Sequence, residues 1–249
     1  MKMEKRNLYC GTAKYYDFLE SKKKIASEIT FLVKHLKKAK VKTILDVGCG
    51  TGIYLVGLKK KGFYVEGLDL SESMLKEVRK KDSKVRLYNQ DMSSFKISKK
   101  YDSILCLSST LASLPKFSLM KKTLKNIFNH LVPKGIFILD LPNHSVEIEE
   151  SNKIKKQISG KISQGKANFT FFSTRNGNRW EQVWSGEIIR NGKKTKFKEL
   201  WEELIYPPKK LENFFKKIGF KVLKVYGTLD GEKFYKDKSY HKIYVLKKY

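Results

Sequence analysis

Residues 44–52 read ILDVGCGTG, an apolar stretch that runs directly into three glycines spaced as Gly-x-Gly-x-Gly. An apolar pattern with helical spacing begins at Ile53, immediately after the last glycine. A buried strand, a glycine-rich turn and a helix in this order let a ligand lie against bare backbone at the amino end of the helix. The stretch therefore predicts an α/β domain that binds a nucleotide-like ligand at this turn.

The turn differs from two common nucleotide-binding motifs. Ile53 stands where the dinucleotide fingerprint G-x-G-x-x-G requires its third glycine, which disfavours an NAD site. No Lys-Ser or Lys-Thr follows the glycines, so the turn is not a phosphate loop either. A tight strand–helix turn without a ligand is the remaining structural alternative.

Two carboxylates follow at spacings that suit a nucleoside. Asp69 ends the second apolar strand, 21 positions after Gly48, where a carboxylate can accept hydrogen bonds from both ribose hydroxyls. The alternative for Asp69 is an acid at a helix amino end, although Ser71 is the better cap for the helix that follows. Asp91 comes after the third strand and can accept from an adenine amino group, or it is an ordinary loop aspartate.

Strand and helix patterns alternate through the first 142 residues. This rhythm predicts a mostly parallel sheet with helices on both faces. The expected strands span 43–47, 64–68, 85–88, 103–107 and 136–141, and the expected helices span 17–40, 53–61, 74–80 and 119–131.

The pattern changes after Pro142. Apolar and polar residues alternate in three runs, and Asn176-Gly177 and Asn191-Gly192 between them are strong hairpin signals, so we expect an antiparallel β insert. A helix opened by Pro207-Pro208 and closed by Gly219 comes next, with two last strands. The expected division is a helical cap (1–40), a ligand-binding core (41–144 and 207–249) and an insert that covers the substrate (145–206).

Five motifs in residues 41–142 carry a family resemblance. In order they are ILDVGCGTG, GLDLSESML, QDMSSF, YDSILCL and HLVPKGIFILDL. Their combination resembles the class I S-adenosylmethionine-dependent methyltransferases. The resemblance implies a doubly wound, mostly parallel seven-stranded sheet of Rossmann-like type, and S-adenosyl-L-methionine as the cofactor.

The resemblance also assigns cofactor contacts. It implies that the three glycines face the methionine part, that Asp46 holds the amino group, that Asp69 binds the ribose and that Asp91 binds the adenine amine. Leu70 and Met92 are implied to pack on the adenine. The full implied cofactor set is Tyr15, Asp46, Gly48, Cys49, Gly50, Gly52, Asp69, Leu70, Asp91, Met92 and Leu107.

Methyl transfer from a sulfonium is an in-line displacement, so the protein must align the nucleophile and, where needed, accept a proton. His144 is a candidate base because it follows the strand 136–141, and Asp140 lies in the last turn of that strand. The alternative for His144 is a solvated loop histidine. His35 and His241 have no companions in the sequence that suggest chemistry.

Aromatic residues of the N-terminal segment and the insert are further candidates. The ring of Tyr16 can lie near the positively charged sulfur, or it can be part of the core. Arg175, Arg179 and Glu203 are polar residues among the insert's aromatics, and we expect them to contact the substrate.

The nature of the methyl acceptor is indicated by motifs that the sequence contains and by motifs that it lacks. The fourth strand ends without an Asp/Asn-Pro-Pro-Tyr/Phe sequence, and the chain has no Pro-Cys pair, which disfavours methylation of nucleic-acid bases. An insert followed by a helix and a closing hairpin, together with Ser108-Ser109, is similar to small-molecule N-methyltransferases that act on amino sugars or glycine. We therefore expect transfer to nitrogen or oxygen of a small molecule.

The net charge of +28 leaves an alternative open. Lysine and arginine number 53 against 25 acids, and the excess is spread over both halves of the chain. Arginine, the usual reader of base edges, is scarce, so a lysine-coated solvated surface is favoured over a nucleic-acid face. An RNA methyltransferase and a non-catalytic nucleoside-binding partner subunit remain as alternatives, and the sequence leaves the oligomeric state open.

The apolar runs and the cysteines of the chain indicate its cellular location. No apolar run approaches the roughly 18 residues that a membrane helix needs. The three cysteines form no Cys-x-x-Cys pair, so neither a disulfide framework nor a metal site is expected. The chain is expected to be a cytoplasmic protein without a membrane partner.

Overall fold

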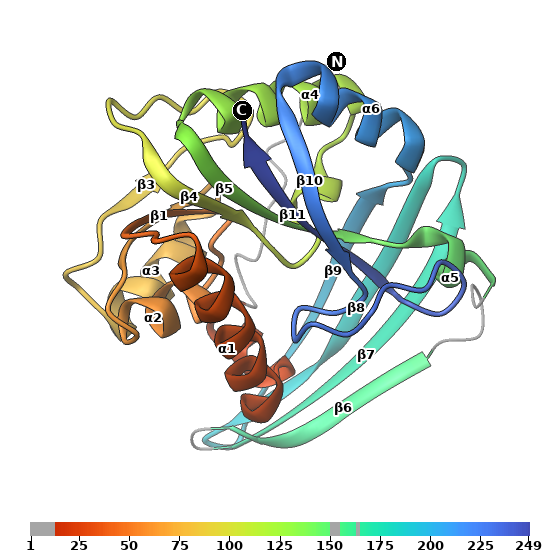
Figure 1. Cartoon of the computed structure of the whole chain (residues 1–249). Coiled ribbons are helices and arrows are strands. Elements are labelled where there is room, and N and C mark those ends of the chain that lie inside the picture. Colours follow the sequence, from red (N-terminus) through yellow and green to blue (C-terminus); the bar gives the residue numbers. More distant parts are fainter. Residues whose placement is uncertain (1–12, 150–154, 163–164) are drawn as a thin grey trace.

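Two β-sheets organise the computed structural model, which describes residues 13–149, 155–162 and 165–249. The larger sheet has seven strands in the order β10-β11-β5-β4-β1-β2-β3, and the smaller has four in the order β6-β7-β8-β9 (Figure 1). The predicted fold class, a doubly wound and mostly parallel seven-stranded sheet with an antiparallel insert, is confirmed.

The large sheet is parallel around its centre and antiparallel at one side. β1 pairs in parallel with β2 and β4, while β11 pairs antiparallel with β5 and β10. The beginning of β11 therefore lies beside the end of β5. Its strands are β1 (Thr43–Val47), β2 (Tyr64–Asp69), β3 (Leu87–Asn89), β4 (Tyr101–Cys106), β5 (Leu131–Pro142), β10 (Phe220–Tyr226) and β11 (His241–Lys248).

Helices cover both faces of this sheet (Figure 1). One face packs on α1 (Lys22–Lys38), α2 (Ile53–Lys59) and α3 (Glu72–Lys81). The other packs on α4 (Phe117–Asn129) and α6 (Pro208–Ile218). Alternate residues of each strand point to opposite faces, which gives the domain two apolar cores separated by the sheet.

The N-terminal segment differs from the single helix expected over 17–40. It consists of a 3₁₀ helix, η1 (Ala13–Leu19), followed by α1. Ser21 causes the break, because its side chain accepts from Lys24 N (3.4 Å) and caps α1. η1 then turns toward the small sheet, where Phe18 stacks on Phe169 at 5.8 Å between ring centroids.

The small sheet contains one strand more than the sequence predicted. Its strands are β6 (Lys155–Ile162), β7 (Gly165–Asn176), β8 (Arg179–Arg190) and β9 (Lys193–Leu204). β6 was missed because its residues, KKQISGKI, alternate weakly and form a strand by pairing with β7. The hairpin signal at Asn191-Gly192 is confirmed, since both residues have positive φ (+49° and +74°).

Smaller differences concern the ends of elements. Pro133-Lys134-Gly135, expected to precede a strand, lies inside β5, with φ +63° at Lys134. Two short helices were not predicted, η2 (Thr110–Ser113) and α5 (His144–Glu149). Gly219 has φ +100° and ends α6, as predicted. Among the helices of the described residues, none combines the length and apolar character needed to cross a bilayer.

Candidate active site

The glycine turn after β1 has a left-handed backbone at each of its three glycines. Gly48, Gly50 and Gly52 have φ of +73°, +53° and +78°. Gly48 N and Cys49 N donate to Leu68 O (2.7 and 3.0 Å), which ties the turn to β2. Gly52 precedes α2 without a side-chain cap. The role of this turn in binding a ligand stays a prediction.

Gly48→Ala is expected to lower the free energy of unfolding by about 2–4 kcal/mol, because overpacking adds to the strain of a left-handed backbone. A Cβ at position 48 would lie 2.2 Å from Thr110 Cγ2. Gly50→Ala is the matched control, since a Cβ there meets nothing within 4 Å. It is expected to cost only about 1 kcal/mol of backbone strain. Urea denaturation measures both, and equal losses would contradict the predicted contact with Thr110.

Asp69 holds the turn from the end of β2. Its Oδ2 accepts from Gly50 N and its Oδ1 accepts from Ser71 N, both at 2.8 Å. Burial raises the pKa of Asp69, although the backbone hydrogen bonds oppose the shift. Ser71 caps α3 by accepting from Met74 N (3.4 Å), as the sequence predicted. A carboxylate has about four acceptor positions, so Asp69 can accept further hydrogen bonds from a ligand.

Asp46, near the end of β1, is a buried carboxylate that lacks a counter-charge. It is 2% exposed, and its Oδ2 has no hydrogen-bond partner among the described residues. Burial and the negative charge of Asp69 raise the pKa of Asp46 to about 7. Leaving such a group unpaired is costly. A cationic group of a ligand at the glycine turn would satisfy Asp46.

The residues implied to hold the adenine lie around the ends of β2 and β3. Leu70 is 56% exposed, and Asn89 Nδ2 fixes its backbone by donating to Leu70 O (2.9 Å). Met92 is partly buried against the core. Asp91 is exposed, and its Oδ1 accepts from Ser93 N (2.6 Å). An exposed leucine beside a pair of polar groups suits a flat ring system.

Two implied cofactor residues are mainly part of the core. Cys49 is 8% exposed and Leu107 is 3% exposed. Leu107 O accepts from Thr110 Oγ1 (2.7 Å) and from Thr110 N (3.2 Å). The next two residues, Ser108 and Ser109, have φ of +52° and +56°, a conformation that non-glycine residues adopt at a cost of about 1–3 kcal/mol each. This turn brings η2 across the end of β4.

The two tyrosines of η1 lie in different surroundings. Tyr16 stacks on Trp184 of β8 (6.2 Å between centroids). Burial, together with acids that include Asp69 and Glu203, raises the pKa of Tyr16. Tyr15 instead packs against the apolar cluster of the small sheet. Tyr16 therefore packs on Trp184 of β8, and Tyr15 packs on the apolar cluster of β7 and β8.

Asp17 fastens η1 over the glycine turn. Its carboxylate accepts from Thr51 Oγ1 and forms an ion pair with Lys81 of α3. Lys81 Nζ also donates to Thr51 O (2.8 Å). The N-terminal segment thus lies over the glycine turn on the side of α3.

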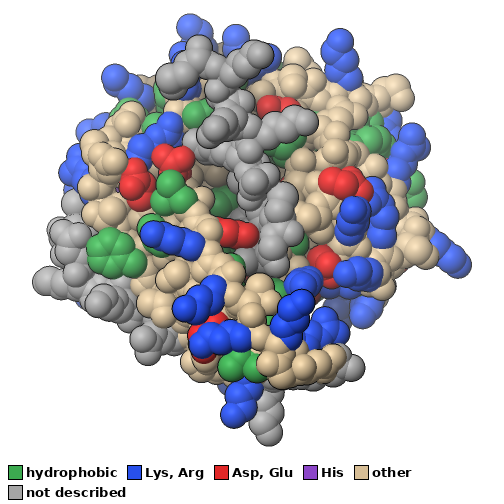
Figure 2. Space-filling model, turned by 180° about the vertical axis from the view of Figure 1, so that it is seen from behind, with side chains coloured by type: hydrophobic (Ala, Val, Ile, Leu, Met, Phe, Trp, Pro, Cys, Tyr) green, Lys and Arg blue, Asp and Glu red, His purple; other side chains and the backbone are tan. Residues whose placement is uncertain are grey.

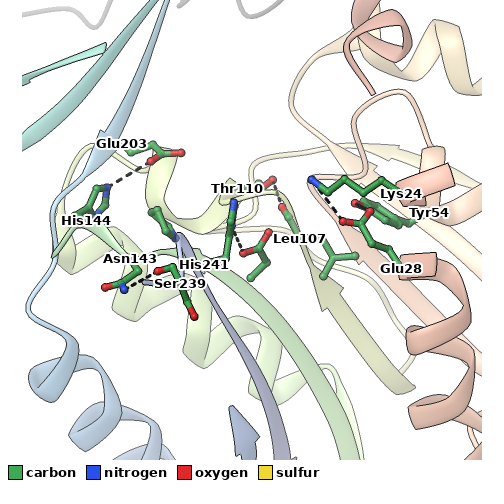
Figure 3. A network of polar contacts seen from close by, with 12 residues as sticks. Lys24, Glu28, Tyr54, Leu107, Thr110, Asn143, His144, Glu203, Ser239 and His241 are labelled. Atoms are coloured by element: carbon green, nitrogen blue, oxygen red, sulfur yellow. Dashed lines mark hydrogen bonds and ion pairs between the residues drawn. The ribbon is translucent and has the colours of Figure 1, made fainter. Parts of the chain in front are cut away.

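Glu203 and His144 meet where β9 reaches the end of β5. Glu203 Oε2 lies 3.4 Å from His144 Nε2, and both side chains are buried, at 7% and 6% exposure (Figure 3). Trp201 Nε1 donates to Glu203 Oε1 (3.2 Å). His144 is the first residue of α5, so a solvated loop histidine is excluded. Trp180, opposite Glu203 in the register, is 1% exposed and its Nε1 has no hydrogen-bond partner among the described residues.

The two arginines expected to contact the substrate have structural partners. Arg175 is exposed near the hairpin between β7 and β8, where its Nε donates to Gly177 O (3.0 Å). Arg179 donates to the carbonyl oxygens of Leu114 and Pro115. Arg179 therefore holds the insert against the segment that links η2 and α4.

Two polar pairs at the same edge were missed by the sequence analysis. His241 Nδ1 lies 2.8 Å from Asp140 Oδ1, so the expectation that His241 has no companion was wrong. Glu28 of α1, 5% exposed, accepts from the hydroxyl of Tyr54 (2.8 Å), and burial raises its pKa. Asp140 inside an apolar strand was a signal for the first pair, whereas Glu28 looked like any polar residue of a helix.

Carboxylates gather near the glycine turn and the ends of β5 and β9, on a chain of net charge +28. They influence one another, since Asp69 raises the pKa of Asp46, and Glu20 and Asp140 add to the raised pKa of Glu28. The group comprises Asp17, Glu20, Glu28, Asp46, Asp69, Asp140 and Glu203. Such a concentration of negative charge favours cationic ligands.

A family model for the methyltransferase domain matches residues 18–225. The chain belongs to this methyltransferase family. The family predicted from the five sequence motifs is thereby confirmed.

Curated relatives include two N-methyltransferases. A dTDP-3-amino-3,6-dideoxy-alpha-D-glucopyranose N,N-dimethyltransferase of Streptomyces fradiae is 29% identical over 46% of this chain and 45% of its own length. A glycine/sarcosine N-methyltransferase of Aphanothece halophytica is 31% identical over 52% of this chain and 51% of its own length. The chain thus spans about half the length of these relatives.

The fold is shared with solved methyltransferases. The crystal structure of an S-adenosylmethionine-dependent methyltransferase from Clostridium acetobutylicum superimposes with a TM-score of 0.81, covering 96% of this chain and 98% of the other. The two sequences are 22% identical, a level at which the likeness supports a common fold.

Proposed function

We propose that this protein is a class I methyltransferase that uses S-adenosyl-L-methionine and transfers a methyl group to nitrogen or oxygen of a small molecule by in-line displacement. The observation that carries the proposal is the unpaired, buried Asp46 beside a glycine turn that Asp69 braces. A cofactor with a positively charged amino group and a ribose satisfies both carboxylates. When bound, it supplies an electrophilic methyl group on a cationic sulfur.

In this proposal, different residues of the chain bind different parts of the cofactor. Asp46 holds the amino group, Asp69 accepts from the ribose hydroxyls and Asp91 accepts from the adenine amine. Gly48 and its neighbours lie against the methionine part, and Leu70 packs on the adenine. The remaining members, carried over from the sequence, are Tyr15, Cys49, Gly50, Gly52, Met92 and Leu107.

The substrate is proposed to bind between the carboxyl edge of the large sheet and the insert, residues 145–206. Tyr16 and His144 would contact the reacting groups, and Glu203 would bind a positively charged part of the acceptor. The carboxylates around the crevice favour an amine over an alcohol, because a protonated amine is attracted to them. The two relatives named above act on amino sugars and on glycine, which also supports nitrogen as the acceptor.

The surface charge is the observation that favours an RNA substrate instead. Figure 2 shows lysine and arginine side chains distributed around the visible face, with acidic and hydrophobic side chains among them. A face that reads nucleic acid concentrates its positive charge. On this face the charge is not concentrated as such a surface would require. A cytoplasmic location is part of the proposal and is supported by the free thiols of Cys49 and Cys106.

The experiment that tests this proposal uses methyl-labelled S-adenosylmethionine and a fractionated cell extract. Label is expected in the small-metabolite pool, and the Asp69→Ala variant is expected to transfer none. Label in RNA would favour the second function. Cofactor binding without transfer to any pool would refute an enzyme and leave a nucleoside-binding subunit.

Affinity for S-adenosylmethionine is expected to rise about tenfold between pH 6 and pH 8. The pKa of Asp46 in the free protein is raised to about 7, and a bound cation favours the ionised form, so binding releases a proton below that pH. Calorimetry in buffers of different ionisation enthalpy measures both the affinity and the proton release. Asp46→Asn is the control, and its affinity should be low and independent of pH. An unchanged wild-type affinity over this range would contradict contact between Asp46 and the cofactor.

A further inference from the structure

The pair formed by Asp140 and His241 has a geometry suited to proton transfer. In the antiparallel register of β5 and β11, His241 lies opposite Pro142 and Asp140 lies opposite Ile243. Asp140 Oδ1 is 2.8 Å from His241 Nδ1, and the Asp140 side chain is 7% exposed. An imidazole that donates Nδ1–H to a carboxylate carries its lone pair on Nε2. A buried carboxylate thus orients His241 as an acceptor of protons.

His241 lies between two other polar pairs. In Figure 3 it lies between the His144–Glu203 pair, next to the insert, and the Glu28–Tyr54 pair of α1 and α2. Ile138 and Ile243, which point to the same face of the sheet as Asp140 and His241, pack in the core beneath α1 and α2. The pair is therefore at the carboxyl end of β5, on the face of the sheet that α1 and α2 cover.

Exposure distinguishes this histidine from His144. The side chain of His241 is 43% exposed, whereas those of His144 and its partner Glu203 are 6% and 7% exposed. A base that works repeatedly must return its proton to water. His241 can do so directly, and His144 is enclosed with a carboxylate that occupies its Nε2 side.

Asp140 acts electrostatically on buried groups of three neighbouring elements. Burial is the main cause of the raised pKa values of Glu28 (α1), Tyr54 (α2) and Cys106 (β4), and the negative charge of Asp140 adds to each. Lys24 of α1 forms an ion pair with Glu28 at 3.7 Å.

We propose that His241 is the general base of the reaction and that Asp140 is its positioning residue; this rests on the proposed methyl transfer to an amine. A protonated acceptor amine gives one proton to His241 Nε2. The freed lone pair forms the nitrogen–methyl bond as the methyl–sulfur bond breaks, and the sulfur keeps that electron pair. The products are the methylated ammonium and neutral S-adenosylhomocysteine, and the imidazolium passes its proton to water.

The test uses the acceptor that label transfer identifies and measures kcat and KM for four variants of the full chain. His241→Gln is expected to lower kcat about a hundredfold or more, the range of a lost general base, with the acceptor KM within about threefold of wild type. His241→Gly should recover at least about tenfold in kcat with added imidazole, since the site is open to solvent. Asp140→Asn should lower kcat about tenfold without rescue by imidazole.

His130→Gln is the matched control, because His130 packs on Phe95 and binds Ile97 N, away from the crevice. Cofactor affinity by calorimetry, expected to be unchanged in His241→Gln, verifies that this variant is folded. If the wild type is active and the kcat of His241→Gln is within threefold of the wild-type value, His241 is not the general base, and the proposed function still stands. A wild type that labels no pool would refute the proposed function, and the assignment with it.

Discussion

Asp69→Ala is expected to weaken S-adenosylmethionine binding by at least about a hundredfold while the chain remains folded. A carboxylate that accepts from two ribose hydroxyls contributes two charge-assisted hydrogen bonds, each about 1.5–3 kcal/mol, and every 1.4 kcal/mol is a factor of about ten. The variant also removes the acceptor of Gly50 N and Ser71 N, which loosens the glycine turn. Both effects act in the same direction, and calorimetry measures their sum.

Two further variants separate the contributions of the charge of Asp69 and of the adenine contact. Asp69→Asn keeps one oxygen acceptor and loses the charge, so its affinity should fall between those of wild type and Asp69→Ala. Asp91→Asn, at the exposed position implied for the adenine amine, should lose about tenfold or less, because one hydrogen bond is involved. Wild-type affinity in a folded Asp69→Ala protein would remove the basis for the cofactor site.

Glu66→Ala is expected to lower the free energy of unfolding by about 3–5 kcal/mol, the cost of breaking a buried ionic network. Glu66 lies in β2 with 0% exposure. It accepts from Lys99 (2.6 Å) and from the hydroxyls of Tyr64 (3.0 Å), Tyr88 (3.0 Å) and Tyr101 (2.5 Å). Without the carboxylate these donors lose their acceptor. The melting temperature should fall by about 10 °C, at roughly 2–4 °C per kcal/mol for a chain of this size.

A matched control and a pH dependence accompany this prediction. Glu72→Ala removes an exposed ion pair with Arg79 and should change stability by less than about 1 kcal/mol. Burial alone would raise the pKa of Glu66, but the hydrogen bonds from Lys99 and the tyrosines outweigh it and hold the pKa below the ordinary 4.5. The stabilisation is therefore complete above pH 4.5 and is lost as the pH falls through the folded-state value. The stability difference between wild type and Glu66→Gln should shrink below pH 4.5; a constant difference would contradict an ionised Glu66.

Sequence reasoning was most successful where neighbouring residues decide the structure. The glycine turn, the cap at Ser71 and the hairpin at Asn191-Gly192 depend on local backbone preferences, and the structure has all three. It was less successful at N-terminal residues 17–40, where Ser21 can cap a helix or be exposed within one. The strand Lys155–Ile162 was missed for a related reason, because its own residues do not favour a strand until β7 is beside it.

The chain itself determined the order of strands and helices, the family and the place of Asp46 and Asp69, because residues at the carboxyl ends of adjacent parallel strands meet at one edge of the sheet. Tertiary structure alone decided which polar groups pair. Asp140 and His241 are 101 positions apart, and they meet because β11 runs antiparallel to β5. Glu203 reaches His144 in the same way, through the packing of the small sheet on the large one. Such contacts depend on register and burial over the whole chain, and no local preference encodes them.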